Sequence, residues 1–538
     1  MNPPAPSAGR ALDAGEGGSE PAVISLVLEQ ARRFVQREVD PIAFDRDAGL
    51  PGPVLEAAKR AGLFGLSIDE KYGGLGLTLG QVCKVVSVLA ERDGGFATTV
   101  GLHNGLGTRG LVTYGEPALQ RMWLPLMASG ECVGSFAATE TGAGSDLMAI
   151  RTKATPVEGG VKLDGEKNYV TNGGFAGLFT VLARSPELGG ARSHCLVCVP
   201  RDTPGVQVGA EEHKLGLRSS STVTIYFDGA LVPMQNVLGT PGQGMAYAMH
   251  ALTWGRTVLA SGCVGAARNA MNAALTHVTT RKQFGRTIGQ FGASRAHVAA
   301  MAARLWAMEA MVENTGEVEA RGQSIDTLSA VTKVFCSDAA FDICDRSIQL
   351  HGALGVLTDV GVDRPLRDCR VTRIFEGAND VVLVHVGAWL LSLPKPDPFR
   401  CAHRGIETRE PLLADACRAW NEVDGRLEQS LRDVRSQFGV KAVKKQLVLQ
   451  RLARAHMALQ AASASIWRAE GSAEAAMAIA QNAVRVLLTE AGRNLDLLPE
   501  GEPDAVRDLD ITEALYSAGR MPEPIRQLLS GPPGCLSP

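Results

Sequence analysis

One carboxylate stands in a position from which it could do chemistry: Glu376, in the run RIFEGAND at 373–380. Gly377 follows it, and glycine adopts backbone angles that other residues avoid. A helix is predicted to begin near Asn379, because asparagine is a favoured N-cap and the apolar run VVLVHVGAWLL follows. The carboxylate is therefore expected on a turn before a helix, where it could act as a general base. A lone loop glutamate is more often a solvated residue stabilised by the helix dipole, so the other motifs must decide.

Two further segments combine hydroxyls, glycines and an aromatic ring. FAATETGAGSD at 136–146 alternates hydroxyl side chains with glycines, which leaves backbone amides free to bind an anionic or polar ligand. In YVTNGG, Tyr169 and Thr171 are two residues apart and share one strand face, where they could cover a flat ring. Taken alone, the two segments are better explained as an ordinary loop and an ordinary cross-strand pair.

Two later segments carry cations and an amide. RKQFG at 281–285 places two cations at a helix end, which alone is typical of a solvated basic turn. SIQLHGALG at 347–355 combines an amide, a histidine and two glycines. His351 by itself is more simply explained as a structural histidine.

Two patterns match known motifs by letter only. Gly105, Gly107 and Gly110 form a G-x-G-x-x-G pattern, but no strand precedes it, so we expect glycines that allow close packing of helices and a ligand. Cys195 and Cys198 lie in HCLVCVP, a predicted strand on which positions three apart face opposite sides. With no second cysteine pair nearby, we predict no metal site.

The composition describes an ordinary globular protein. With 538 residues, 45% hydrophobic and 21% charged, the chain should form two to four domains. Its net charge of −3 gives no reason to expect nucleic acid, and the 11 scattered cysteines should be reduced thiols. The N-terminus is rich in Pro, Gly and Ala, carries some acidic residues and lacks the layout of a secretion signal. We expect a cytoplasmic, bacterial protein.

Hydrophobic periodicity predicts a mainly α fold with a central antiparallel β-domain. Helices are expected over VLEAAKRAGLFGL and FATTVGLHNGLG (96–107), and a hairpin is expected to turn at Asp164–Gly165. A proline-rich break at 393–400 marks a boundary. The predicted order is a disordered tail at 1–23, an N-terminal helical domain at 24–134, a β-domain at 135–244, a helical bundle at 245–395 and a C-terminal helical domain at 396–538.

In this order, TETGAGSD, YVTNGG, RKQFGR, QLHGALG and RIFEGAND resemble the acyl-CoA dehydrogenase family of flavoproteins. The resemblance runs from about residue 25 to 395 and implies the family's helical, β and helical-bundle domains. The C-terminal helical extension and the form RIFEGAND are most similar to the very-long-chain subgroup.

The resemblance implies FAD-dependent dehydrogenation of medium- to long-chain acyl-CoA thioesters to trans-2-enoyl-CoA, as in fatty acid β-oxidation. Glu376 would remove the α-proton while flavin N5 accepts the β-hydride. Hydrogen bonds from the Glu376 amide and the flavin ribityl chain would stabilise the enolate, and burial should raise the pKa of Glu376. Some relatives carry the base immediately before an arginine of a bundle helix, but here Gly255 precedes Arg256, so Glu376 has no competitor.

The resemblance also implies binding residues and a homo-oligomer, with a dimer favoured, because residues of a neighbouring subunit would complete the FAD site. Arg281, Gln349 and Gly352 would reach across to the neighbour's FAD. Three positions depart from the family pattern: Tyr169 replaces Trp, Ala353 replaces Gly and Ala378 replaces Thr. The implied FAD residues are Phe136, Ala138, Thr139, Ser145, Tyr169, Thr171, Arg281, Phe284, Gln349, Gly352 and Asp380, and the implied substrate residues are Ser145, Arg256 and Gly377.

Chain length and partners are further expectations. The helix at 96–107 matches the one that floors the family's acyl pocket, and Gly101, Gly105 and Gly107 would deepen it for a long chain. An electron-transferring flavoprotein is the expected electron acceptor. The stretch 450–471 could be an interfacial membrane helix, but packing against the bundle is favoured. Two alternatives remain: an acyl-CoA oxidase, and an assembly protein that kept the fold and lost turnover.

Overall fold

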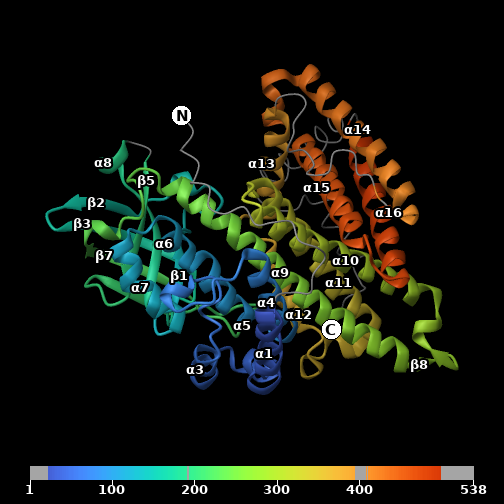
Figure 1. Cartoon of the computed structure of the whole chain (residues 1–538), viewed down its shortest axis with the longest axis horizontal. Helices are drawn as coiled ribbons and strands as arrows, with labels where there is room; N and C mark the ends of the chain where they lie inside the picture. Colours follow the sequence, from blue (N-terminus) through green and yellow to red (C-terminus); the bar gives the residue numbers. More distant parts are fainter. Residues whose placement is uncertain (1–21, 191–192, 394–407, 409, 499–538) are drawn as a thin grey trace, which may run out of the picture.

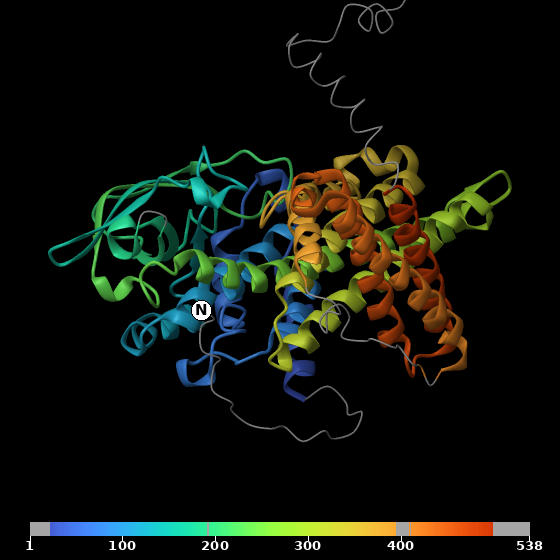
Figure 2. The same cartoon turned by 90° about the horizontal axis from the view of Figure 1, so that it is seen from above.

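The computed structural model describes residues 22–190, 193–393, 408 and 410–498. Helices dominate, and a seven-stranded sheet lies at one side of them (Figure 1), which confirms the predicted fold class. Figure 1 shows the sheet at the left, the N-terminal helices below the centre and the C-terminal helices at the upper right, and Figure 2 shows the same arrangement from above. Of the predicted tail at 1–23, residues 1–21 lie outside the described part and the last two begin the first helix. Most of the proline-rich break lies outside it as well.

The N-terminal helices have recognisable start and stop signals. Thr78 and Gln81 form a capping box at the start of α4, and Gly130, at φ 78°, ends α7. Helix α3 is shorter than predicted, because Gly62 takes a φ of 72° just beyond its end. These helices are α1 (Ala22–Glu38), α2 (Pro41–Asp47), α3 (Gly52–Arg60), α4 (Leu79–Arg92), α5 (Gly94–Leu102), the π-helical turn η2 (His103–Gly107), α6 (Thr108–Tyr114) and α7 (Pro117–Ser129).

The predicted helix at 96–107 is therefore two elements, α5 and η2. Gly107 explains the close packing here, because a Cβ on it would come within 2.8 Å of the Gly134 backbone. A Cβ on Gly110 would come within 3.1 Å of Leu196. The three glycines of the G-x-G-x-x-G pattern thus lie in helical turns and serve packing, as expected.

The sheet has seven strands in the order β1-β4-β2-β3-β7-β6, with β5 paired to β4. Pairing is antiparallel except where β4 meets β1 and β2. Strands β4 and β5 are buried on both faces, and Cys195 and Cys198 lie in two different apolar clusters on opposite sides of β5. The strands are β1 (Gly134–Ala137), β2 (Lys153–Val157), β3 (Gly160–Thr171), β4 (Leu178–Arg184), β5 (His194–Pro200), β6 (Val206–Glu211) and β7 (Thr222–Val232), with the short helix α8 (Pro186–Gly189) after β4.

The predicted hairpin turn at Asp164–Gly165 is wrong. The chain turns at 158–159, and Val157 pairs with Gly160 across the β2–β3 hairpin. Asp164 and Gly165 lie inside β3, where the register with β7 shifts. Glycine is needed there because a Cβ would come within 2.7 Å of Thr152. The Asp-Gly pair therefore serves a bulge in a continuous strand.

The helical bundle is organised around α9 (Gly244–Thr280), which crosses the molecule from the sheet to the small hairpin of β8 (Lys282–Gln283) and β9 (Arg286–Thr287) (Figure 1). Its 37 residues span roughly 55 Å. A Cβ on Gly265 would lie 2.3 Å from the Ser87 carbonyl oxygen, so α4 and α9 pack backbone to backbone. The other bundle helices are α10 (Gly292–Ala320), α11 (Asp326–His351), α12 (Arg364–Thr372) and α13 (Asn379–Ser392).

Three long helices form the C-terminal unit: α14 (Ala414–Phe438), α15 (Gln446–Ala469) and α16 (Glu474–Asp496). Most of α15 is buried, and it packs against α13, α10 and α16. The predicted packing of 450–471 against the bundle is thus confirmed. Among the described residues, no helix combines the length and apolar character that crossing a bilayer requires.

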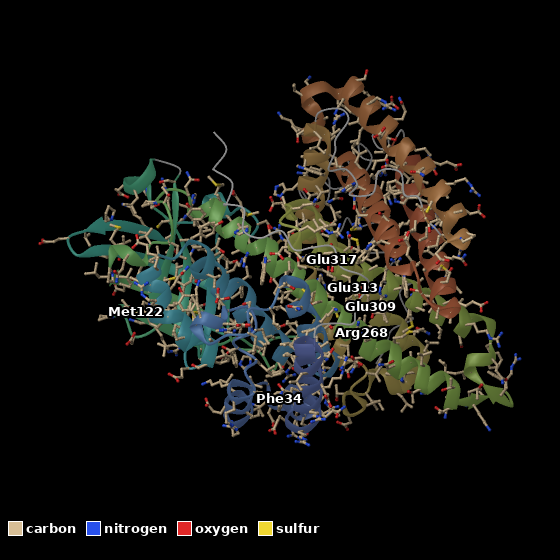
Figure 3. The ribbon with its side chains drawn as sticks, viewed as in Figure 1. Phe34, Met122, Arg268, Glu309, Glu313 and Glu317 are labelled. Carbon is tan, nitrogen blue, oxygen red and sulfur yellow. The ribbon has the colours of Figure 1, made fainter. Side chains whose placement is uncertain are left out.

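Arg468 joins this unit to the bundle. It forms ion pairs with Glu309 at 2.6 Å and Glu313 at 2.9 Å, and its guanidinium stacks over Trp306. Glu309 also pairs with Arg268 of α9 (Figure 3).

Replacing Arg468 with methionine should therefore lower the free energy of unfolding by about 2 kcal/mol, because two partly buried carboxylates each lose one ion pair. Urea unfolding followed by circular dichroism measures this. Arg426→Met is the matched control, since the Arg426–Asp496 pair is exposed and should contribute less than about 0.5 kcal/mol. Equal effects of the two substitutions would contradict the assignment.

Candidate active site

Glu376 lies on a strained turn between α12 and α13. Its φ is 54°, a left-handed value that costs non-glycine residues roughly 1 kcal/mol or more and is concentrated at functional sites. Gly377 has a φ of 104°, and a Cβ there would lie 2.9 Å from Val382. The predicted N-cap role of Asn379 is wrong, because Asn379 is the first residue of α13 and its side chain points into the bundle, where Lys333 and Ser337 bind it.

The carboxyl group of Glu376 faces an enclosed space. Its Oε2 is buried and has no hydrogen-bond partner, although the residue as a whole is only part-buried. Burial raises the pKa of Glu376 to about 7, against the opposing charges of Lys333 and Arg256. A carboxylate is suited to accept a proton when its pKa is near neutral and its oxygen accepts no hydrogen bond from a neighbour. This environment does not fit a solvated surface glutamate.

Arg256 and Gly255 of α9 meet this turn. Arg256 Nε donates a hydrogen bond of 3.0 Å to the Glu376 carbonyl oxygen. A Cβ on Gly255 would lie 2.9 Å from Glu376 Oε2 and 2.7 Å from Leu106. Position 255 therefore faces the same point as the Glu376 carboxyl, and only glycine leaves that carboxyl undisturbed.

A large cavity opens between the sheet and helices α9 and α13. Glu376, Gly377 and Arg256 line it from the helices. Sequence reasoning missed that Met245, Met249 and His385 also line it, because these residues look like ordinary helix positions. The predicted residues that it brings together from the sheet side are Phe136, Ala138, Thr139, Ser145, Tyr169 and Thr171.

The sheet side of this cavity has an irregular strand with a buried anchor. Tyr169 takes a φ of 56° where the β3–β7 register shifts, and its side chain is 67% exposed. Behind it, the buried Lys167 pairs with Glu140 at 2.8 Å and donates to the Ala138 carbonyl oxygen at 2.9 Å. Glu140 in turn accepts from the Arg151 and Thr152 amides. The loop at 136–146 is thus tied to the strand that carries Tyr169.

Five predicted residues lie away from this cavity. Arg281 and Phe284 follow the far end of α9, about 37 Å along the helix from Arg256. Phe284 is 92% exposed, and Gln349 and Gly352 are exposed where α11 ends. Asp380 is exposed on the first turn of α13, where its carbonyl oxygen accepts from Gln450. One copy of this chain does not bring Arg281 and Phe284 to its own Glu376.

A second, apolar cavity continues from Glu376 into the helices. Glycine and alanine line much of it. Leu102, Leu106, Phe375 and Glu376 line both cavities, so the carboxyl stands where the two meet. We call this second cavity the tunnel. Its small lining residues are Ala90, Gly94, Ala97, Gly101, Gly255, Gly262 and Ala266.

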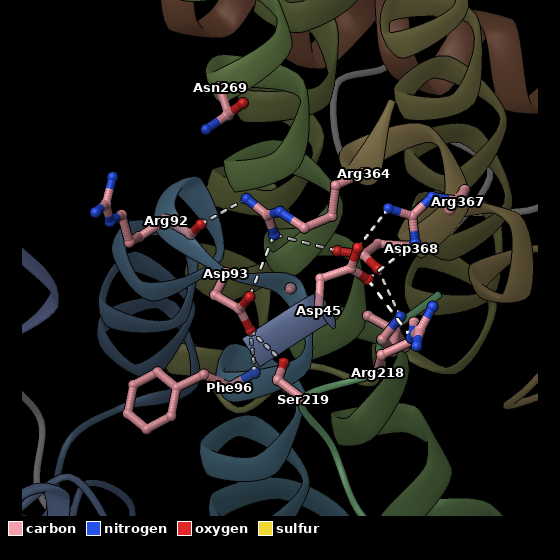
Figure 4. A network of polar contacts seen from close by, with 12 residues as sticks. Asp45, Arg92, Asp93, Phe96, Arg218, Ser219, Asn269, Arg364, Arg367 and Asp368 are labelled. Carbon is pink, nitrogen blue, oxygen red and sulfur yellow. Dashed lines mark hydrogen bonds and ion pairs between the residues drawn. The ribbon is translucent and has the colours of Figure 1, made fainter. Parts of the chain in front are cut away.

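A buried polar network stands at the other end of this tunnel. Arg364 Nη1 lies 3.2 Å from Asp93 and 3.4 Å from Asp368, and the Leu217 amide donates to Asp368 (Figure 4). Burial raises the pKa of Asp368 to about 6. Asp368 itself lines the tunnel, so the apolar surface ends at this network.

Comparison with known proteins places this arrangement in a family. Models of the acyl-CoA dehydrogenase N-terminal, middle and C-terminal domains match residues 24–131, 135–230 and 242–391. The probable acyl-CoA dehydrogenase FadE25 of Mycobacterium tuberculosis is 34% identical over 363 residues, which cover 67% of this chain and 93% of that relative. The chain belongs to the acyl-CoA dehydrogenase family. The resemblance drawn from its motifs is thus confirmed.

Other members of the acyl-CoA dehydrogenase family share parts of the chain. Mouse very long-chain specific acyl-CoA dehydrogenase is 36% identical over 362 residues, which cover 66% of this chain but only 55% of that relative. The structure of an acyl-CoA dehydrogenase complexed with FAD from Bacillus anthracis has a TM-score of 0.80 at 26% identity, and covers 94% of this chain and 92% of that one. The C-terminal helices are therefore shared with that structure.

Proposed function

We propose that the chain catalyses FAD-dependent α,β-dehydrogenation of acyl-CoA thioesters, with Glu376 as the base. The observation that carries this proposal is the position of Glu376 at the junction of two cavities of different character. One is wide and partly polar, as a flavin and a thioester require, and the other is narrow and apolar, as an acyl chain requires.

The residues of the wide cavity fit FAD. Thr139 and Thr171 supply hydroxyls, Tyr169 is held outward at the strand irregularity, and a Cβ on Gly144 would meet nothing within 4 Å. A flat ring could lie against this strand face and hydrogen-bond along its edge. FAD bound there would take up the β-hydrogen together with its electron pair.

The protein's own contribution is to hold and move the α-proton. Glu376 Oε2 accepts the proton, and the tunnel keeps water from the carbon that loses it. Within the described residues, the backbone N–H of Glu376 has no hydrogen-bond acceptor, so it is available to the thioester oxygen. Arg256 donates a hydrogen bond to the carbonyl oxygen of the same residue and thereby helps to hold the turn in place.

The tunnel favours a medium to long acyl chain. It follows α5 from Leu102 back to Gly94, and a Cβ on Gly101 would already touch Val258 at 3.0 Å. Each methylene buried there contributes about 0.8 kcal/mol.

Anaerobic titration of the FAD-loaded protein with acyl-CoAs of increasing length tests the proposal. We expect bleaching of the flavin absorbance, with palmitoyl-CoA more effective than butyryl-CoA. No bleaching by any acyl-CoA would leave an assembly protein as the better description. Reoxidation of the bleached protein by oxygen, compared with an electron-transferring flavoprotein, distinguishes an oxidase from the dehydrogenase that we propose.

We also propose that Arg281, Phe284, Gln349 and Gly352 complete the FAD site of a second copy. All four residues are exposed, and the length of α9 separates Arg281 and Phe284 from Arg256 of the same copy; both observations support this. Phe284→Ala should then weaken FAD retention. Mixed oligomers of Phe284→Ala and Glu376→Gln chains should regain one intact site, and absence of regained bleaching in such mixtures would contradict the shared site.

A further inference from the structure

Lys333 is a buried cation behind the Glu376 turn. It lies in the middle of α11, and its side chain has no exposed surface. Its Nζ donates to the Gly377 carbonyl oxygen at 2.7 Å and to Asn379 Oδ1 at 2.8 Å. Burying an ammonium costs several kcal/mol unless it is paired and hydrogen-bonded, so these two bonds are strong constraints on the turn.

Asn379 extends this support to the bundle. Its amide nitrogen donates to Ser337 at 2.9 Å and to Asp338 at 3.0 Å, one turn further along α11. Lys333 and Asn379 therefore fasten the turn from the side of α11, while Arg256 fastens it from α9. These hydrogen bonds hold Glu376 at a φ of 54°, a backbone angle that is unfavourable for a residue with a Cβ.

Resting on the proposed function, we propose that Lys333 is a positioning residue for the Glu376 base. It fixes the turn through Gly377 and Asn379, and its charge favours the ionised carboxylate. Lys333 from α11 and Arg256 from α9 are the cations that face Glu376, and Asp338 and the Cys263 thiol also face Lys333. Removing one of two nearby cations raises the pKa of a carboxyl group, so the base would be protonated over a wider pH range.

The experiment compares Lys333→Met, Asn379→Ala and Lys214→Met with the wild type, all loaded with FAD. Single-turnover bleaching by saturating acyl-CoA is measured as a function of pH. For Lys333→Met we expect the midpoint of the rise in rate to move upward by about one pH unit, and the rate below the midpoint to fall about tenfold.

The other two variants separate charge from anchoring. Asn379→Ala keeps the Lys333 charge, so the rate should fall while the midpoint stays in place. Lys214 is the matched control, because burial lowers the pKa of both lysines to about 8 while Lys214 hydrogen-bonds Ser220 and Thr222 of another loop. Lys214→Met should leave the midpoint unchanged.

A readout without turnover completes the test. Backbone hydrogen exchange of 374–379 should accelerate in Lys333→Met and in Asn379→Ala while the rest of α11 stays protected. An unmoved midpoint with unchanged exchange would overturn the inference for Lys333 even if the wild type bleaches. A wild type that does not bleach with any acyl-CoA would overturn the proposed function instead. If Lys333→Met fails to fold, the Asn379→Ala exchange result still decides whether the anchor holds the turn.

Discussion

Glu376→Gln should reduce flavin bleaching by acyl-CoA at least about 10³-fold, within the range that removal of a general base produces. Glutamine has almost the same shape, so FAD and acyl-CoA should still bind. The amide cannot accept the α-proton, and position 255, which faces the same point, carries only glycine. Stopped-flow bleaching gives the rate, and the shift of the flavin spectrum on adding ligand gives binding.

Glu313→Gln is the control for loss of a partly buried carboxylate. Burial raises the pKa of Glu313 as well. Glu313 lies on α10, however, and forms its ion pair with Arg468 of the C-terminal helices. This variant should bleach at the wild-type rate. Bleaching by Glu376→Gln within about tenfold of the wild type would show that another group takes the proton, since so small a loss is below that of a missing base.

Gly262→Leu should convert the substrate preference from long to short chains. Gly262 lines the tunnel seven residues beyond Gly255, and a Cβ there would meet nothing within 4 Å, so a larger side chain can enter the empty space. If four methylenes lose their burial, kcat/KM for palmitoyl-CoA should fall by about two orders of magnitude, or about 3 kcal/mol. Butyryl-CoA should be used as before.

The matched control is Gly425→Leu. Gly425 is also a helical glycine with nothing within 4 Å of a Cβ, but it is exposed on α14. Gly425→Leu should gain the same helix propensity as Gly262→Leu, but it leaves the tunnel unchanged. An equal loss for palmitoyl-CoA and butyryl-CoA in Gly262→Leu would mean that the acyl chain takes a different path.

Local signals in the sequence were enough to predict much of the fold. The spacing of hydrophobic residues and the capping residues indicated the long helices. The order of the motifs up to Glu376 indicated the family. They did not predict the hairpin, because an Asp-Gly pair fits both a two-residue turn and a bulge, and the choice at Asp164 depends on contact with Thr152. They also predicted Asn379 as an N-cap, whereas its side chain forms hydrogen bonds with Lys333 and Ser337.

The interior of the site was harder to predict. Lys333 comes more than 40 residues before Glu376, and its only local signal is a charge among Ala330, Val331 and Val334, a helix stretch that is otherwise apolar. The tunnel depends on the packing of α5 against α9, which no single segment encodes. Pairs of glycines on facing helices, such as Gly105 and Gly255, become meaningful only once the helices are placed.

The continuity of helix α9 restricts the insertions and deletions that this chain can tolerate during evolution. A continuous helix fixes both the separation and the relative direction of its two ends by residue count alone. Inserting or deleting one residue between Arg256 and Arg281 would turn one end by about 100° against the other. In the proposed dimer, that change would misalign an arginine in each of two active sites at once. Length variation should therefore be excluded from α9 and tolerated in surface loops.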